Sequence, residues 1–227
     1  MTAAVRPRAV LLDFDGLICD TESAGHRAWR EIYAACGLRF PESLWHSMVG
    51  RADGERLAAD DLAARVGGTR AATLVADRKE RKRQLCDSQP LRPGVRELLD
   101  AARARGVQAA VVSSAPHAWV AHHLQRLGVR DRFAALVTGD LAARHKPHPD
   151  LYELALRVLD CAPAHAVAFE DSAIGVRAAR AAGVRCLAVP NAVGDAAELG
   201  HADAVLPSLT HYDLAADGFR TEGTPVV

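Results

Sequence analysis

Short apolar runs alternate with amphipathic segments through most of the chain, and this alternation limits the folds that it can adopt. The runs lie at 107–112, 134–137, 166–169 and 184–189. They lack the polar alternation of a half-exposed strand, so they predict strands buried on both faces of a sheet. The segments between them have helical spacing and lie at 95–105, 117–127, 151–159 and 172–182. Such alternation predicts a parallel α/β sheet, which residues 8–14 join as a first strand.

Residues from about 19 to 88 show helical spacing and no strand run. Four helices are predicted there, over 21–36, 42–49, 54–65 and 70–86. The stretch 89–94, Gln-Pro-Leu-Arg-Pro-Gly, returns the chain to the sheet, because two prolines and a glycine cannot continue a helix. We therefore expect a doubly wound, Rossmann-like core of residues 1–18 and 89–227, with a four-helix cap domain inserted at 19–88.

The charge balance and the cysteine content indicate which binding partners and which cellular location to expect. Lysine plus arginine equals aspartate plus glutamate at 28 each among 227 residues, so no global field favours nucleic acid or an anionic membrane. No segment approaches the roughly 18 apolar residues of a membrane span, and the first eight residues lack a signal-peptide core. The five cysteines are scattered without a CxxC pair, which favours reduced thiols. We expect a cytoplasmic protein, and a monomer by default.

Two carboxylates follow the first apolar run directly, as Asp13-Phe14-Asp15-Gly16. Ionised carboxylates that close repel each other, so a cation is expected beside them. Mg²⁺ is the natural candidate because it prefers carboxylate and carbonyl oxygen.

Polar residues also follow the other predicted strands. Ser113 and Ser114 come after the second strand, Lys146-Pro147 lies in a loop after the third, and Glu170-Asp171 follow the fourth. In a doubly wound sheet, ligands bind beyond the carboxyl ends of the strands. We therefore expect these side chains and the first pair of aspartates to form one site.

This ordered set of motifs resembles the haloacid dehalogenase superfamily, and the helical insert after the first motif is similar to its β-phosphoglucomutase-like and phosphatase branch. The resemblance covers nearly the whole chain. It implies that Asp13 is the nucleophile, which forms an aspartyl-phosphate. It implies that Asp15 protonates the leaving alcohol and then takes a proton from water. Dehalogenases of the family lack this second aspartate, so its presence favours phosphate chemistry.

The resemblance also assigns the remaining motif residues. Mg²⁺ would be held by Asp13, Asp171 and the backbone carbonyl of Asp15, with Glu170 directly or through water. Lys146 would offset negative charge, and Ser113 with the Ser114 N–H would hold the phosphoryl oxygens. Arg51 matches a cap position that touches substrate in relatives, with a solvated arginine as the alternative.

The substrate is expected to be a small phosphorylated metabolite such as a sugar or polyol phosphate. A β-phosphoglucomutase-like mutase is one alternative, but the mutase histidine position is Gly25 here, which favours a phosphatase. His26 is its neighbour and would point about 100° away on a helix. A catalytically retired binding or regulatory module is the other alternative, although no expected catalytic residue is missing.

Three further features have simpler interpretations. The basic run 78–83 is interpreted as the solvated face of a cap helix rather than a nucleic-acid patch. His122 and His123 lack the spacing of a zinc site and are expected to be surface residues. Trp29 and Trp45 are expected in the cap core or lining a cleft.

Overall fold

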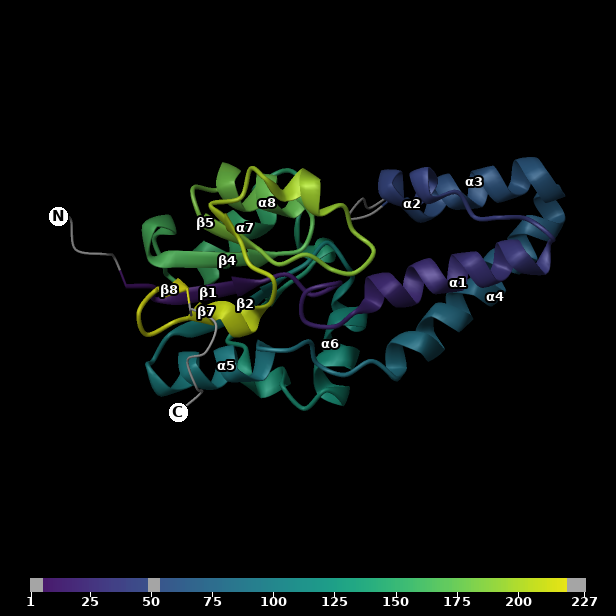
Figure 1. Cartoon of the computed structure of the whole chain (residues 1–227). Coiled ribbons are helices and arrows are strands. Elements are labelled where there is room, and N and C mark those ends of the chain that lie inside the picture. Colours follow the sequence, from purple (N-terminus) through teal and green to yellow (C-terminus); the bar gives the residue numbers. More distant parts are fainter. Residues whose placement is uncertain (1–5, 49–53, 220–227) are drawn as a thin grey trace.

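Six parallel strands form the central sheet of the computed structural model, which describes residues 6–48 and 54–219 (Figure 1). Their order across the sheet is β3-β2-β1-β4-β5-β6. The strands are β1 (Ala9–Leu12), β2 (Gln108–Val112), β3 (Ala135–Val137), β4 (Ala166–Glu170), β5 (Arg185–Ala188) and β6 (Ala204–Val205). The chain builds outward from β1 to β3 and then crosses to β4, so the strand order reverses between β1 and β4. Ligands bind at such a switch point in doubly wound sheets.

Alternate residues of each strand face opposite layers of helices. Val10 and Leu12 pack in one apolar cluster with α5 (Val95–Ala104) and α6 (His117–Arg126). Ala9 and Leu11 pack in a second cluster with α7 (Asp150–Val158) and α8 (Ala173–Ala181). The two helix pairs lie on opposite faces of the sheet in Figure 1. Both faces are therefore covered, which explains why the strand sequences are continuously apolar.

In the part of the chain that the structure describes, four helices lie between β1 and the return to the sheet. They are α1 (Thr21–Ala35), α2 (Glu42–Met48), α3 (Gly54–Val66) and α4 (Gly68–Asp87). They share an apolar cluster of their own that includes Trp29, Phe40 and Trp45. Figure 1 shows them to one side of the sheet, beyond the end at which β1 leads into α1.

The predicted doubly wound fold is confirmed, and the main elements lie within a few residues of their predicted ends. Strand β6 and the small antiparallel hairpin of β7 (Tyr212–Asp213) and β8 (Gly218–Phe219) were not predicted. Each has two residues, too few to give a periodic signal. Within residues 6–48 and 54–219, five short 3₁₀ helices lie in the connections: η1 (Arg130–Arg132), η2 (Gly139–Leu141), η3 (Pro163–His165), η4 (Ala196–Leu199) and η5 (Leu209–His211). None of the described helices is long and apolar enough to cross a membrane.

Candidate active site

Lys146 is the centre of a buried charged cluster at the carboxyl end of the sheet. Its Nζ lies 2.6 Å from Asp13 Oδ1, 2.5 Å from Glu170 Oε1 and 2.8 Å from the Val112 carbonyl oxygen. An ammonium group has three protons, and these three acceptors use all of them. Asp13 follows β1, Val112 ends β2 and Glu170 ends β4. The fold therefore brings Lys146 against Asp13, which lies 133 positions away in the sequence.

Glu170 is fully buried and has only one of its two carboxylate oxygens satisfied. Oε1 accepts hydrogen bonds from Lys146 and, at 2.5 Å, from the Tyr152 hydroxyl. Oε2 has no hydrogen-bond partner among the described residues. Helix α8 approaches this carboxylate through Gly175, where a Cβ atom would stand 1.9 Å from Oε2. The close approach requires glycine at that position.

Asp171 lies beside Glu170 and is held by an amide. Asn191 Nδ2 donates to Asp171 Oδ2 at 2.7 Å. Gly16 packs against the same carboxylate, and a Cβ atom at this position would lie 1.8 Å from Asp171 Oδ2. Its φ of +81° lies in the left-handed region. Glycine is required at position 16 both for the left-handed backbone and for this approach.

The electrostatics of the cluster favour an added cation. Burial raises the pKa of Asp13 to about 8, and the negative charge of Glu170 adds to this rise. The positive charge of Lys146 lowers the pKa of Asp13 but offsets the rise only in part. Burial and the neighbouring carboxylates also hold the pKa of Asp171 well above its usual range. Burial alone would lower the pKa of Lys146, but the charges of Asp13 and Glu170 outweigh it and raise that pKa, so Lys146 stays protonated. One ammonium group cannot neutralise three carboxylates.

The donor set fits a hard divalent cation. Asp13, Glu170 and Asp171 each offer a carboxylate oxygen, and these oxygens all lie within 4.8 Å of one another. Oε2 of Glu170 is buried without a hydrogen-bond partner among the described residues, and a group in that condition favours a further positive charge beside it. Oxygen-only ligand sets suit Mg²⁺ and similar cations.

The side chain of Asp15 points away from this carboxylate cluster. Its Oδ1 accepts hydrogen bonds from Thr21 Oγ1 at 2.7 Å and from Trp119 Nε1 at 2.9 Å. Asp15 still lines the same cavity as Asp13. The two aspartates therefore occupy different environments, one beside a buried ammonium group and the other held by neutral donors.

Ser113 and Ser114 lie at the carboxyl end of β2, against the same cavity. The Ser113 hydroxyl accepts from the Ala115 N–H at 3.1 Å, which leaves its proton free to donate. Ser114 Oγ is buried without a partner among the described residues. Polar groups in this condition favour a polar ligand such as a phosphoryl oxygen.

A cavity of about 560 Å³ separates these residues from the four inserted helices. Its wall on the helical side includes Trp45, Glu22 and four cations of α4, namely Arg78, Lys79, Lys82 and Arg83. Burial raises the pKa of Glu22 to about 7. The cavity is thus closed on one side by the sheet and on the other by the insert.

The interpretation of the basic run as a solvated face is wrong for Arg78. This side chain is 2 % exposed, pairs with Glu55 and stacks over the Trp29 ring at 4.6 Å. Helix α4 has one face that packs against the other inserted helices, and a run of charged residues does not indicate which of them lies on that face. Trp29 lies in the core of the insert and Trp45 lines the cavity, as predicted. Arg51 lies outside the described residues.

Gly25 is buried beside the cavity wall. A Cβ atom there would lie 3.5 Å from Arg78 Nη2, 3.6 Å from Lys82 Cε and 3.6 Å from Trp45 Cη2. These are ordinary van der Waals distances, so a Cβ atom at this position would contact the cavity wall without a clash. His26 instead contacts Glu42, with Nε2 and Oε2 2.9 Å apart.

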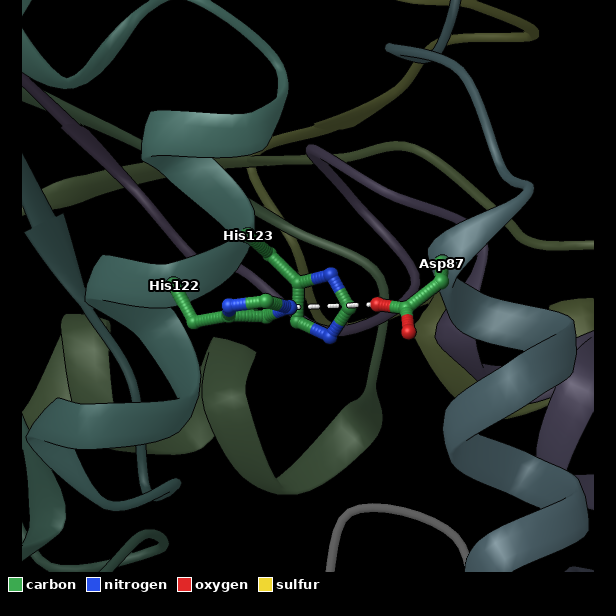
Figure 2. Close-up of side chains that lie close together, drawn as sticks. All are labelled: Asp87, His122 and His123. Atoms are coloured by element: carbon green, nitrogen blue, oxygen red, sulfur yellow. Dashed lines mark hydrogen bonds and ion pairs between the residues drawn. The ribbon is translucent and has the colours of Figure 1, made fainter.

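A second cluster is formed by Asp87, His122 and His123 (Figure 2), none of which lines the cavity. His122 Nε2 lies 3.1 Å from Asp87 Oδ1. Figure 2 shows the two ring nitrogens of His123 on opposite sides of the line that joins His122 to Asp87. The Arg126 guanidinium lies 3.4 Å from His123 Nδ1 and would repel a metal ion. We therefore interpret the cluster as a contact between α4 and α6, not as a metal site.

The expectation that both histidines lie on the surface is wrong for His123, which is fully buried. Its ring stacks on Phe14 and packs edge-on against Trp119, with ring centroids 5.9 Å and 4.3 Å away. Burial, with the Arg126 charge, lowers the pKa of His123 to about 4.

This lowered pKa predicts a pH dependence of stability. Between pH 6.5 and pH 4 the unfolded chain binds a proton at His123 that the folded chain does not. The contribution is fully present above pH 6.5 and is lost as the pH falls through this window, by about 3 kcal/mol at most. We expect His123→Gln to show a shallower loss of unfolding free energy between pH 7 and pH 4, measured by urea denaturation.

His117→Gln serves as the matched control, because His117 is an exposed residue of the same helix. It should leave the pH dependence unchanged. Parallel pH profiles for the wild type and His123→Gln would show that His123 titrates normally in the folded protein.

Several residues of the site were not predicted from the sequence. Thr21, Trp119, Tyr152 and Asn191 each donate a hydrogen bond to one of the predicted carboxylates. Asn191 follows β5 by three positions, so the strand-end rule could have found it. The other three project from helices, and helical spacing does not reveal which carboxylate they reach.

Comparisons with known proteins agree with this arrangement. The sequence profile of the haloacid dehalogenase-like hydrolases matches residues 7–183. The chain is 36 % identical over 209 residues to YhcW of Bacillus subtilis, provisionally named a phosphatase, with 92 % of this chain and 94 % of YhcW covered. It is 31 % identical to a phosphorylated carbohydrates phosphatase of Thermotoga maritima, with 87 % and 92 % covered. The crystal structure of CbbY from Rhodobacter sphaeroides in complex with phosphate superposes with a TM-score of 0.70 at 31 % identity, covering 89 % of this chain and 95 % of CbbY.

Proposed function

The chain belongs to the haloacid dehalogenase-like hydrolase family, among its β-phosphoglucomutase-like and phosphatase members, and from this premise we propose its reaction. We propose a Mg²⁺-dependent phosphatase that hydrolyses a small phosphorylated carbohydrate, such as a sugar or polyol phosphate, through an aspartyl-phosphate. The observation that carries the proposal is the separation of the two aspartates. Asp13 lies in the carboxylate cluster with Lys146, whereas Asp15 lies on the same cavity but is held by neutral donors. This division matches a nucleophile and a separate acid and base.

The proposed reaction has two steps. Asp13 attacks phosphorus, the bond from phosphorus to the alcohol oxygen breaks, and Asp15 gives its proton to that oxygen. Water then attacks the aspartyl-phosphate, gives a proton to Asp15, and releases phosphate and the free Asp13 carboxylate. The protons balance over the cycle, because Asp15 returns to its starting state.

The neighbouring residues hold and neutralise the phosphoryl group. Lys146 offsets negative charge beside Asp13, and Ser113 and Ser114 offer a hydroxyl and an N–H to the phosphoryl oxygens. Asp13, Glu170, Asp171 and the Asp15 carbonyl would hold Mg²⁺. When bound, the ion would supply positive charge that offsets the negative charge of the phosphoryl group and the carboxylates.

We further propose that residues 19–88 form a cap domain that covers the substrate. Its separate apolar cluster and the cavity between it and the sheet support this division. A cap closed over the cavity would exclude stray water from the aspartyl-phosphate. Five unpaired cysteines support a cytoplasmic location, and a monomer remains our prediction.

A mutase is the second candidate, and the residue at position 25 weighs against it. A mutase of this branch would carry a histidine there, whereas this chain has glycine. His26 pairs with Glu42 instead. Water is therefore the favoured final acceptor of the phosphoryl group.

The test is hydrolysis of a panel of sugar and polyol phosphates by the purified protein. With Mg²⁺ we expect inorganic phosphate and free sugar in equal amounts, detected by a phosphate assay and by NMR. EDTA should abolish the release and excess Mg²⁺ should restore it, because the carboxylate cluster needs a cation. Isomerised sugar phosphate, formed with a bisphosphate activator and without free sugar, would replace the phosphatase proposal by the mutase. No turnover of any panel member would favour a retired binding module.

A further inference from the structure

One face of α6 packs against the segments that connect the sheet to the inserted helices. Trp119, His122, His123 and Arg126 are spaced by three, four and seven positions, so they share one face of the helix. Arg126 donates to the carbonyl oxygens of Gln89 and Cys86, at 2.8 Å and 3.1 Å. His122 pairs with Asp87, as Figure 2 shows, and His123 stacks on Phe14. Trp119 stands at the cavity end of this face and reaches Asp15.

The hydrogen bonds to Asp15 are distributed unequally between its two oxygens. Thr21 Oγ1 and Trp119 Nε1 both donate to Oδ1, at 2.7 Å and 2.9 Å. A carboxylate oxygen has about two lone-pair directions, so these two donors fill the acceptor capacity of Oδ1. Oδ2 accepts no hydrogen bond from any described residue. Oδ2 is therefore the oxygen of Asp15 that these two donors leave free.

The indole ring of Trp119 is itself held in place. The neutral ring of His123 packs edge-on against it, with centroids 4.3 Å apart. Lys82 Nζ, from α4 on the opposite wall, lies 5.7 Å from the centroid of the indole ring. Such a cation favours the ring face. The indole thus lies between His123 and a cation of the opposite wall, while its N–H donates to Asp15.

We propose that Trp119, together with Thr21, positions the general acid. An indole N–H is a donor only, so Trp119 cannot take the proton and acts through Asp15. By holding Oδ1, it fixes the rotation of the carboxyl group and leaves Oδ2 to give its proton to the leaving oxygen. The proposal rests on the proposed phosphatase function, in which Asp15 is the acid and base.

The experiment compares two substrates that differ in how much they need the acid. Phenyl phosphate and 4-nitrophenyl phosphate have similar size, but phenoxide is the poorer leaving group and needs the proton more. The ratio kcat/KM reports only the steps up to the aspartyl-phosphate, so the role of Asp15 in the second step does not enter. General acids contribute about 10²–10⁴-fold. We expect Trp119→Phe to lower kcat/KM for phenyl phosphate about tenfold more than for 4-nitrophenyl phosphate.

Trp45→Phe is the matched control. Trp45 also lines the cavity and also donates its indole N–H, but to the Val193 carbonyl oxygen at 2.9 Å. Trp45→Phe should lower kcat/KM for both substrates by the same factor. An equal loss on both substrates in Trp119→Phe, or no loss, would show that Trp119 only packs and would overturn the proposal.

A second measurement tests the contact without turnover. Trp119→Phe identifies the Trp119 indole N–H among the three indole resonances in a ¹⁵N–¹H NMR spectrum. In Asp15→Ala this resonance should move upfield and exchange faster with water, while those of Trp29 and Trp45 stay in place. An unmoved Trp119 resonance would overturn the proposal, whether or not the wild type hydrolyses an aryl phosphate. Failure of the wild type to hydrolyse either aryl phosphate would count against the proposed function and not against this contact.

Discussion

Asp13→Asn is expected to abolish phosphate release while the protein still folds. An amide has nearly the shape of the carboxylate but cannot attack phosphorus or carry the phosphoryl group. Removal of a nucleophile costs about 10⁴-fold or more in kcat. Burial already raises the pKa of Asp13, so the neutral amide removes a charge that the site accommodates poorly. Lys146 keeps Glu170 and the Val112 carbonyl oxygen as partners. The thermal midpoint should therefore change little.

The measurement is phosphate release at saturating Mg²⁺, together with mass spectrometry of rapidly quenched enzyme. The wild type should show a phosphoryl adduct on the peptide that contains Asp13, and the variant should show none. Asp160→Asn is the control, because Asp160 is exposed and its φ of 48° suits asparagine. Phosphate release that persists in pure Asp13→Asn would refute the nucleophile assignment.

Lys146→Met is expected to produce the largest loss of stability of any single substitution in the site. The lysine side chain is 3 % exposed and its three protons go to Asp13, Glu170 and the Val112 carbonyl oxygen. Methionine fills a similar volume but leaves the buried carboxyl groups of Asp13 and Glu170 without the ammonium group that both contact. Breaking a buried ion pair in this way costs about 3–5 kcal/mol. For a protein of this size that corresponds to a fall of about 10 °C in Tm.

The control for this prediction is Lys79→Met. Lys79 is exposed on α4 and makes no ion pair with a described residue, so its replacement should change the unfolding free energy by less than about 0.5 kcal/mol. The double variant Lys146→Met/Glu170→Gln should recover part of the stability, because it removes one of the uncompensated charges. The unfolding free energies of all three variants and of the wild type are measured by urea denaturation of the metal-free protein. Equal stability of Lys146→Met and the wild type would show that the cluster is not held by this ammonium group.

The carboxylate cluster was predicted from the sequence because parallel strands end at one edge of the sheet. Asp13, Lys146, Glu170 and Asp171 follow strands or their loops, so their convergence depends only on the strands being parallel and adjacent. The apolar runs supplied that information. Serines 113 and 114 were placed in the same way. The domain boundaries at 18/19 and 88/89 and the roles of these residues stay predictions.

The contacts from helices were not predictable in the same way. Trp119 and His123 were assigned to the helix that contains them, but its charge and apolar spacing did not show that their face meets Asp15 and Phe14. Arg78 belongs to a charge run that favours solvent, yet it packs on Trp29. The rotation of each helix about its axis decides such contacts.

The sequence by itself determined the sheet, the helical insert and the order of polar residues along one edge, because these follow from local periodicity and from the geometry of parallel strands. Only the tertiary structure decided which donors hold each carboxylate. In the folded protein Thr21 and Trp119 donate hydrogen bonds to Asp15, Tyr152 donates to Glu170, and Asn191 donates to Asp171. Trp119 and Asp15 are 104 positions apart, and a contact at that separation depends on how whole helices pack on the sheet. Packing of that kind is set by the combined fit of many apolar side chains, which no short stretch of sequence contains.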